Sequence, residues 1–210
     1  MKISLIIPSR NNLKYLEWAY NAVRKNQDNH EVEVCVADDF SEDGTKEWCE
    51  QTAAKDSQFK WIRNEGPERQ GLVILNDRLI NEVATHDMCM IYHADMYLCP
   101  GALDAIEKHM YQNVVSTRMV RGELDRAPKP KTIVSLTRIE PPLHPPGPEK
   151  VLKDFGIEPE EFDEEGLIDE LSKFKVGTYY ENKTTEGIFA PWAFWKKDFQ
   201  EIGGHDTLFA

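Results

Sequence analysis

The sequence has little cysteine and no long apolar run. None of its four cysteines belongs to a Cys-x-x-Cys pair, so we expect neither a zinc site nor a disulfide framework. No apolar stretch approaches the ~20 residues that a membrane-spanning helix needs, so we expect no membrane span. The N-terminal segment has a single lysine and no small-residue cleavage site, which predicts a cytoplasmic protein without a secretory signal.

Basic residues are also scarce in this chain. Lys and Arg number 25 against 37 Asp and Glu, giving a formal net charge of -12, which argues against a general nucleic-acid binder. Residues 149–174 alone hold ten acids and three bases, a net of -7, so the rest of the chain carries only -5. The acidity therefore belongs mostly to one segment and says little about a site elsewhere.

Strand-like and helical patterns alternate regularly through residues 1–120. The predicted strands cover 3–7, 32–37, 59–63, 88–92 and 114–118, and the predicted helices cover 13–25, 46–55, 72–84 and 101–111. Short links between such elements imply right-handed crossovers and a mainly parallel central sheet flanked by helices. The sequence therefore predicts an α/β fold.

The pattern changes after residue 120. Proline is concentrated between residues 127 and 148, which disfavours helix, and short helices are predicted at 149–155 and 159–174. We interpret residues 125–180 as an excursion from the core, and the pattern leaves open whether it is a lid or a solvated surface element.

The C-terminal part begins with an aromatic, strand-like block at 187–195. A short helix over 196–202 then leads to Gly203-Gly204-His205-Asp206, and the sequence stops at residues 208–210. An apolar end directly after such a turn predicts a truncated chain.

The turn after the second predicted strand carries the strongest functional signal. Its Ser41, Asp43 and Gly44 are explained by turn formation and helix capping. Two adjacent acids, Asp38 and Asp39, are explained less well in this way, because like charges repel. We therefore interpret this acidic pair as part of a ligand site.

Polar side chains also end or follow other predicted strands. Ser9, Arg10 and Asn11 follow the first strand, and His93 and Asp95 follow the fourth. Because the carboxyl ends of parallel strands share one edge, where ligands bind in open α/β sheets, we expect all these groups to line one crevice. A carboxylate beside an imidazole suits a divalent metal, which can bridge a diphosphate. The simpler alternative for His93 is a strand-end histidine that bonds to backbone.

These residues resemble the motifs of family 2 glycosyltransferases, which have the GT-A fold, a Rossmann-like nucleotide-diphospho-sugar transferase fold. The resemblance covers residues 1–120 and 187–206. Five stretches carry it: Ser4–Asn11 resembles the first-strand motif, Asp38–Thr45 resembles D-D-x-S-x-D-G-T closely, Gly71 with Asn76 is similar to G-x-x-x-A-R-N with Ile74 and Leu75 in place of Ala-Arg, Ile91–Met96 with Pro100–Leu103 resembles the D-x-D region, and Ile202–Asp206 resembles G-G-F-D.

The resemblance implies an inverting, metal-dependent transfer of a sugar from a nucleotide-diphosphate sugar, most simply a UDP-sugar, to a glycan or another hydroxyl acceptor. It implies one glycosyltransferase domain over residues 1–210. Within it, 1–120 is the nucleotide-sugar-binding half, 121–186 an insertion or acceptor-side cover, and 187–210 the start of the acceptor half.

The resemblance also implies roles for individual residues. Asp39 is expected to accept a hydrogen bond from the nucleotide base, and Asp38 to lie beside the ribose or phosphates. Asp95, with His93, is expected to bind Mn²⁺ or Mg²⁺. The full set of expected donor-binding residues is Pro8, Ser9, Arg10, Asn11, Asp38, Asp39, Arg69, Gly71, Asn76, His93, Ala94 and Asp95.

The acceptor side is less well marked. Trp192 and His205 are the expected acceptor-binding residues, although an aromatic run of this kind is more often strand core. The family's acidic E-D element normally follows G-G-F-D, and this sequence ends before it. Asp206 is therefore the candidate general base, with capping of the following turn as its alternative.

Two other interpretations compete with sugar transfer. A sugar-nucleotide pyrophosphorylase has a similar sheet but usually opens its first strand into a glycine-rich loop, and residues 8–11 contain no glycine. A non-catalytic nucleotide-sugar or glycan-binding module is favoured by His93, which replaces the usual first Asp of D-x-D, and by the missing E-D element. The second alternative stays open.

Overall fold

The computed structural model describes seven stretches of the chain: residues 1–112, 118–120, 123–125, 131–143, 145–147, 150–173 and 189–206. The chain divides into two compact units, one made of Met1–Val134 with Pro191–Ala210 and the other of Ser135–Ala190. The first unit holds all the candidate site residues, and each unit is described by itself.

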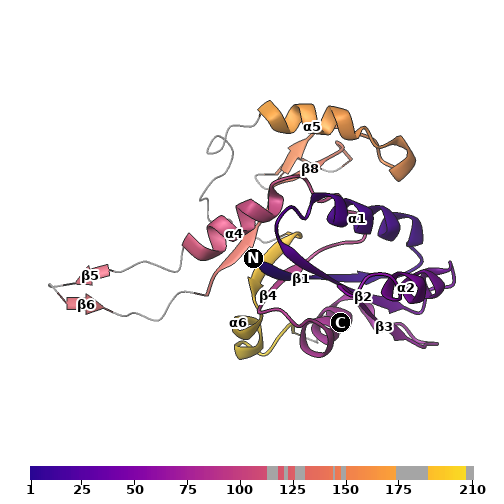
Figure 1. Cartoon of the computed structure of the whole chain (residues 1–210), viewed down its shortest axis with the longest axis horizontal. Helices are drawn as coiled ribbons and strands as arrows, with labels where there is room; N and C mark the ends of the chain where they lie inside the picture. Colours follow the sequence, from indigo (N-terminus) through magenta and orange to yellow (C-terminus); the bar gives the residue numbers. More distant parts are fainter. Residues whose placement is uncertain are drawn as a thin grey trace. The chain divides into compact units, whose positions relative to one another are not determined.

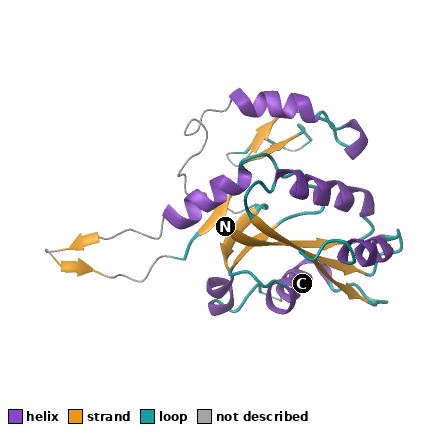
Figure 2. Cartoon of the chain, in the orientation of Figure 1, coloured by secondary structure: helices purple, strands orange, loops and turns teal. Residues whose placement is uncertain are grey.

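A six-stranded sheet forms the centre of the first unit, in the order β3-β2-β1-β4-β10-β7. Its strands are β1 (Lys2–Ser9), β2 (Glu31–Asp39), β3 (Phe59–Asn64), β4 (Met88–Ile91), β10 (Trp192–Trp195) and β7 (Ile133–Ser135). The first four strands are parallel, and β10 runs antiparallel to β4. The α/β fold with a mainly parallel sheet is thereby confirmed (Figure 2).

Helices lie on both faces of this sheet, with α1 and α6 on opposite sides (Figure 1). Their bounds are α1 (Leu13–Asn26), α2 (Thr45–Ala53), α3 (Gly71–Arg78), the π-helical turn η1 (Leu79–Val83), α4 (Ala102–Gln112) and α6 (Lys196–Glu201). The helix predicted over 72–84 is therefore an α-helix that continues into a π turn. Within the described residues, no helix is long and apolar enough to cross a membrane.

The central strands explain why this fold forms. Residues Ile3–Ile7 of β1 and Val32–Asp39 of β2 are all buried, as expected for parallel strands covered on both faces. Each of these strands pairs residue for residue with its neighbour, from Lys2 opposite Glu31 to Ser9 opposite Asp38. The register brings the carboxyl ends of β1 and β2 level, and the polar turns that follow begin at the same edge.

The second unit contains two short parallel strands, β8 (Arg138–Glu140) and β9 (Lys150–Leu152), a 3-10 turn η2 (Pro159–Glu161), and helix α5 (Glu164–Lys173). The helix predicted at 149–155 is wrong. Residues Lys150–Leu152 pair with β8 instead, and Lys150 forms an ion pair with Glu140 at 2.7 Å. A partner strand ten residues away overrides a weak local helical pattern.

Other predicted elements fall partly outside the described residues. The helix predicted at 159–174 is split into η2 and α5, with residue 174 not described. The strand predicted at 114–118 lies outside them except for Arg118, which begins a short antiparallel pair of β5 (Arg118–Val120) and β6 (Glu123–Asp125). Residues 187–188 and 208–210 also lie outside.

Candidate functional site

Asp39, the last residue of β2, is the centre of a hydrogen-bonded clamp. Its carboxylate is 3 % exposed and accepts hydrogen bonds from the Asn64 side chain (2.7 Å) and the backbone N–H groups of Gln70 (3.0 Å) and Gly71 (3.1 Å). The Arg69 guanidinium lies 3.9 Å away. Burial raises the pKa of Asp39, but these donors outweigh burial and hold the pKa below its ordinary value. Asp39 is therefore ionised, and it fixes the loop that opens α3.

Asp38 has a different environment, although it adjoins Asp39. Its side chain is fully buried, accepts the Ser41 N–H at 3.0 Å and forms an ion pair with Arg63. Arg63 also donates to the Ser41 carbonyl at 3.1 Å. The structure thus turns Asp38 inward, where it holds the turn after β2, and it does not face solvent beside Asp39.

The turns after β1 and β2 are bound to each other. Asn11 donates its backbone N–H to Ser41 Oγ (2.9 Å), and its side-chain oxygen accepts the Glu42 N–H (2.9 Å). Asp43 accepts the Leu13 N–H at the start of α1 (2.9 Å). Asn11 therefore fixes the turn after β1 against the turn after β2, and the two turns together line the carboxyl edge of the sheet.

The end of β1 faces the same edge. Ser9 is paired in register with Asp38, and its hydroxyl is buried without a hydrogen-bond partner among the described residues. Arg10 donates to the Asp39 carbonyl at 3.3 Å, and Pro8 is half-buried beside them. An unsatisfied buried hydroxyl is costly in a folded protein, which marks Ser9 as a group that awaits a ligand atom.

His93, Ala94 and Asp95 follow β4 directly. The N–H of Tyr92 bonds to the Ile6 carbonyl of β1 at 3.0 Å, so β4 ends beside the other two strands. His93 is half-buried and Asp95 is exposed, and within the described residues neither side chain makes a hydrogen bond or ion pair. A free carboxylate and a free imidazole are suitable donors for a divalent cation, Mn²⁺ accepting the nitrogen ligand more readily than Mg²⁺.

Helix α3 connects the Asp39 clamp to the C-terminal turn. Asn76, on α3, is 4 % exposed, and its side-chain oxygen has no partner among the described residues. The next residue, Asp77, accepts the His205 N–H (3.3 Å) and lies 2.5 Å from His205 Nδ1. Gly204 is held against the same carboxylate, since a Cβ there would approach Asp77 to 2.7 Å.

The aromatic residues of β10 and α6 surround His205. The His205 ring lies 5.0 Å from the Phe199 ring and 6.3 Å from the Trp192 ring, both edge to face. Trp192 is paired in register with Ile91, the last residue of β4. The two expected acceptor-side residues are therefore neighbours. Asp206, which follows them, is exposed.

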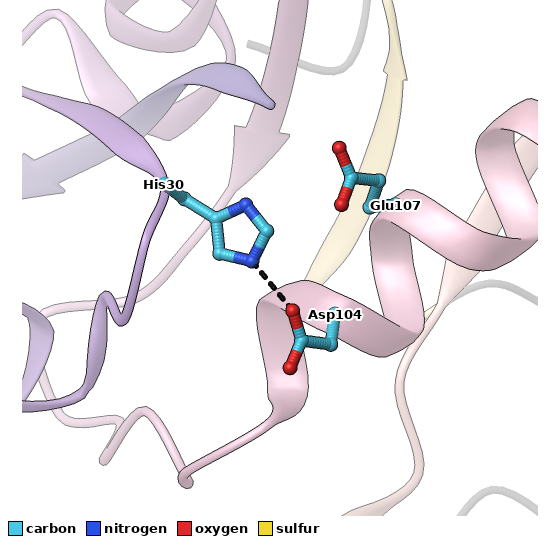
Figure 3. A group of neighbouring side chains, drawn as sticks. All are labelled: His30, Asp104 and Glu107. Atoms are coloured by element: carbon cyan, nitrogen blue, oxygen red, sulfur yellow. Dashed lines mark hydrogen bonds and ion pairs between the residues drawn. The ribbon is translucent and has the colours of Figure 1, made fainter.

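A separate cluster joins His30, Asp104 and Glu107, whose ligand-type atoms lie within 4.8 Å of one another (Figure 3). It is the one such group of three within the described part of the chain. The N-terminal ammonium of Met1 lies 3.0 Å from both His30 Nδ1 and Glu107, so a cation already balances this cluster. His30 precedes β2, at the edge of the sheet opposite Asp39, so this cluster is distinct from His93 and Asp95.

The amino-acid sequence also matches a known protein family over most of the region just described. The family model described as glycosyl transferase family 2 matches residues 4–164. The chain belongs to glycosyl transferase family 2.

Individual relatives of this family 2 chain are distant. It is 28% identical over 116 residues to abequosyltransferase RfbV of Salmonella typhimurium. The aligned region covers 52% of this chain and 33% of that protein. A mannosyltransferase from Pyrobaculum calidifontis, solved with GDP-Man and Mn²⁺, has a TM-score of 0.59 at 17% identity, covering 98% of this chain and 47% of that one. TarS of S. aureus, solved with UDP-GlcNAc, has a TM-score of 0.47 at 24% identity, covering 57% and 37%. This chain thus spans a third of its curated relative and under half of both solved structures.

Three residues of this candidate site were not singled out from sequence. Asn64 ends β3 just as Asp39 ends β2, so the strand-end rule itself would have found it. Arg63 lies opposite Asp38 in register, which is visible only once the pairing of β2 with β3 is known. Asp77 has no sequence signal, because its partner His205 is 128 residues away.

Proposed function

We propose that this chain is the donor-binding part of an enzyme that transfers a sugar from a nucleotide-diphosphate sugar to an acceptor hydroxyl, with inversion. The observation that carries the proposal is the meeting of three strand ends, marked by Ser9, the Asp39 clamp and Asp95, at one edge of the sheet in a family 2 chain. Ligands of open α/β sheets bind at this edge.

Asp39 is the proposed recognition group for the nucleotide base. A carboxylate has about four acceptor positions, and internal N–H groups occupy three of those of Asp39. The remaining position suits a ring N–H of uracil, thymine or guanine. We propose a UDP-sugar as donor, and the GDP-Man of the Pyrobaculum enzyme makes GDP-sugars the first alternative to test. Arg69, which is 66% exposed, is the proposed phosphate partner beside Asp39.

Asp95 and His93 are the proposed holders of a divalent cation, Mn²⁺ or Mg²⁺. Such an ion supplies charge neutralisation for the departing nucleoside diphosphate. Ser9, Arg10 and Asn76 are the proposed polar contacts of the donor, since the buried oxygens of Ser9 and Asn76 lack partners among the described residues. Asp38 supports the site through Arg63 and Ser41.

A thermal-shift panel tests this proposal. UDP-, GDP- and dTDP-sugars are each added with and without Mn²⁺, because a ligand that binds the folded state raises the midpoint. One nucleotide class should raise it, and more so with Mn²⁺. No shift with any of them contradicts the proposal.

A non-catalytic binding module is the second candidate function, favoured by His93 in place of the family's usual Asp. It predicts the same nucleotide binding without turnover. Release of nucleoside diphosphate from the bound donor, measured with Mn²⁺, separates the two candidates, since only the enzyme transfers the sugar to water or an acceptor.

A further inference from the structure

We propose that His205 is the general base of the transfer and that Asp77 positions it. This inference rests on the proposed function and deepens it, because it names the group that takes the proton from the acceptor hydroxyl. The contacts that carry it are the two bonds from His205 to the Asp77 carboxylate, 2.5 Å from Nδ1 and 3.3 Å from the backbone N–H.

The Asp77 contact determines which ring nitrogen is basic. An ionised carboxylate only accepts hydrogen bonds, so Nδ1 of the neutral imidazole carries the hydrogen and donates it to Asp77. Nε2 then carries the lone pair. Within the described part of the chain Nε2 has no hydrogen-bond partner, and the His205 side chain is 26% exposed. A carboxylate that holds a histidine with its other nitrogen directed outward is the base arrangement of the catalytic triads.

Two elements link this imidazole to the proposed donor site. The first is α3: its first N–H, at Gly71, bonds to Asp39, and Asp77 follows six residues later, about 9 Å along the helix axis. The second is Trp192, which is paired with the last residue of β4 and lies 6.3 Å from the His205 ring. His205 is thus hydrogen-bonded to α3, which begins beside Asp39, and lies near Trp192, which is paired with the end of β4.

Trp192 also supplies a reason for an acceptor sugar to bind there. Its half-buried indole stands edge to face with the imidazole, so a sugar ring packed on Trp192 presents its hydroxyls near His205. The proposed acceptor surface and the proposed base are therefore adjacent.

The chemical step balances with groups already named. Nε2 of His205 takes the proton of the acceptor hydroxyl while that oxygen forms a bond to the anomeric carbon of the donor. The bond from the anomeric carbon to the β-phosphate oxygen breaks, and the nucleoside diphosphate leaves with the electron pair. The proton passes from His205 to solvent. Water in place of the acceptor gives donor hydrolysis by the same step.

The test compares four variants in donor hydrolysis with Mn²⁺, using the nucleotide class identified by thermal shift. His205→Asn keeps a donor for Asp77 but has no basic nitrogen, and should lower turnover about 100-fold or more with donor affinity unchanged. Asp77→Asn should lower turnover about 10-fold or more, because it no longer fixes the tautomer. His86 lies before β4 at the other edge, so His86→Asn should leave turnover within about twofold, and Asp206→Asn tests the alternative carboxylate base.

Two further readouts separate a base from a merely structural histidine. The pH profile of the wild-type rate should differ from that of His205→Asn, because only the wild type has a basic side chain at this position. Added imidazole should restore turnover to His205→Ala, because the space left by the removed side chain can admit a substitute base.

Several results overturn the inference. They are unchanged turnover or an unchanged pH profile in His205→Asn, and loss of turnover in Asp206→Asn instead. Both are differences between variants of an active chain, whereas failure of the proposed function is seen in the wild type itself, as absence of nucleotide binding or as donor binding without turnover.

Discussion

Replacing Glu33 by glutamine should destabilise the protein at neutral pH and much less in acid. Glu33 is 1% exposed on β2, yet its carboxylate has four short polar contacts: Lys60 Nζ at 2.5 Å, Ser4 Oγ at 2.6 Å, and the Thr85 hydroxyl and N–H at 2.7 and 2.8 Å. The Cys35 thiol adds a longer one at 3.4 Å. Burial alone raises the pKa, but these donors outweigh it and lower the pKa of Glu33 from 4.5 to about 2.

The size of the effect follows from this lowered pKa. A shift from 4.5 to about 2 corresponds to about 3 kcal/mol of stability at pH 7. Because the pKa is depressed in the folded state, this contribution is fully present well above pH 4.5 and is lost as the pH falls toward 2. Near pH 3 about 1.4 kcal/mol should remain, by the same linkage relation.

The assay is urea unfolding of the wild type and Glu33→Gln at pH 7, 5, 4 and 3. The stability difference should be about 3 kcal/mol at pH 7 and should shrink steadily toward pH 3. Glu31→Gln is the matched control, because Glu31 lies two residues earlier on β2 but is half-exposed and pairs with Lys2 at the surface. A Glu33→Gln deficit that does not change with pH would refute this reasoning.

Three further outcomes are expected. Asp38→Asn should cost about 3 kcal/mol in urea unfolding, because it removes the buried carboxylate that is paired with Arg63 and leaves that cation only the exposed Glu65 at 3.6 Å; a loss under 1 kcal/mol would contradict the inward role of Asp38. Gly71→Ala should weaken nucleotide binding and lower the free energy of unfolding by about 1–2 kcal/mol. Gly71 has φ +81, where an added Cβ contacts no other atom but strains the backbone, so unchanged binding in calorimetry would argue against the clamp. Burial raises the pKa of Cys49 and Cys89 to about 12, so neither thiol should react with a disulfide reagent at pH 8 before unfolding; rapid labelling of either, located by mass spectrometry, would show that it is accessible.

The elements of the sheet were predictable because their signals are local. Strands β1 and β2 are short apolar runs that end in polar turns, and periodicity located both within two residues at each end. The predicted helix at 149–155 failed because Lys150–Leu152 pairs with a strand that no local pattern connects to it. Composition shows that this segment is polar, but pairing with a segment elsewhere in the chain decides whether it forms a helix or a strand.

The candidate site shows the same division. The strand-end rule brought together Ser9, Asp39 and Asp95, because topology alone fixes which ends share an edge. It could not tell that Asp38 faces inward, since the direction depends on Arg63 across the β2–β3 pair. It also could not find Asp77, which acts only through a residue of a distant turn.

The most direct measurement of the central claim is a calorimetric titration of UDP, GDP and dTDP, each with Mn²⁺, into the wild type, Asp39→Asn and Glu31→Gln. The wild type and Glu31→Gln should bind one nucleotide with equal affinity, and Asp39→Asn should bind it at least about 10-fold more weakly, a loss of about 1.4 kcal/mol. Circular dichroism below the unfolding midpoint confirms that each variant is folded. Equal nucleotide affinity in folded Asp39→Asn, or no binding by the wild type, would contradict a nucleotide-sugar site at this edge of the sheet.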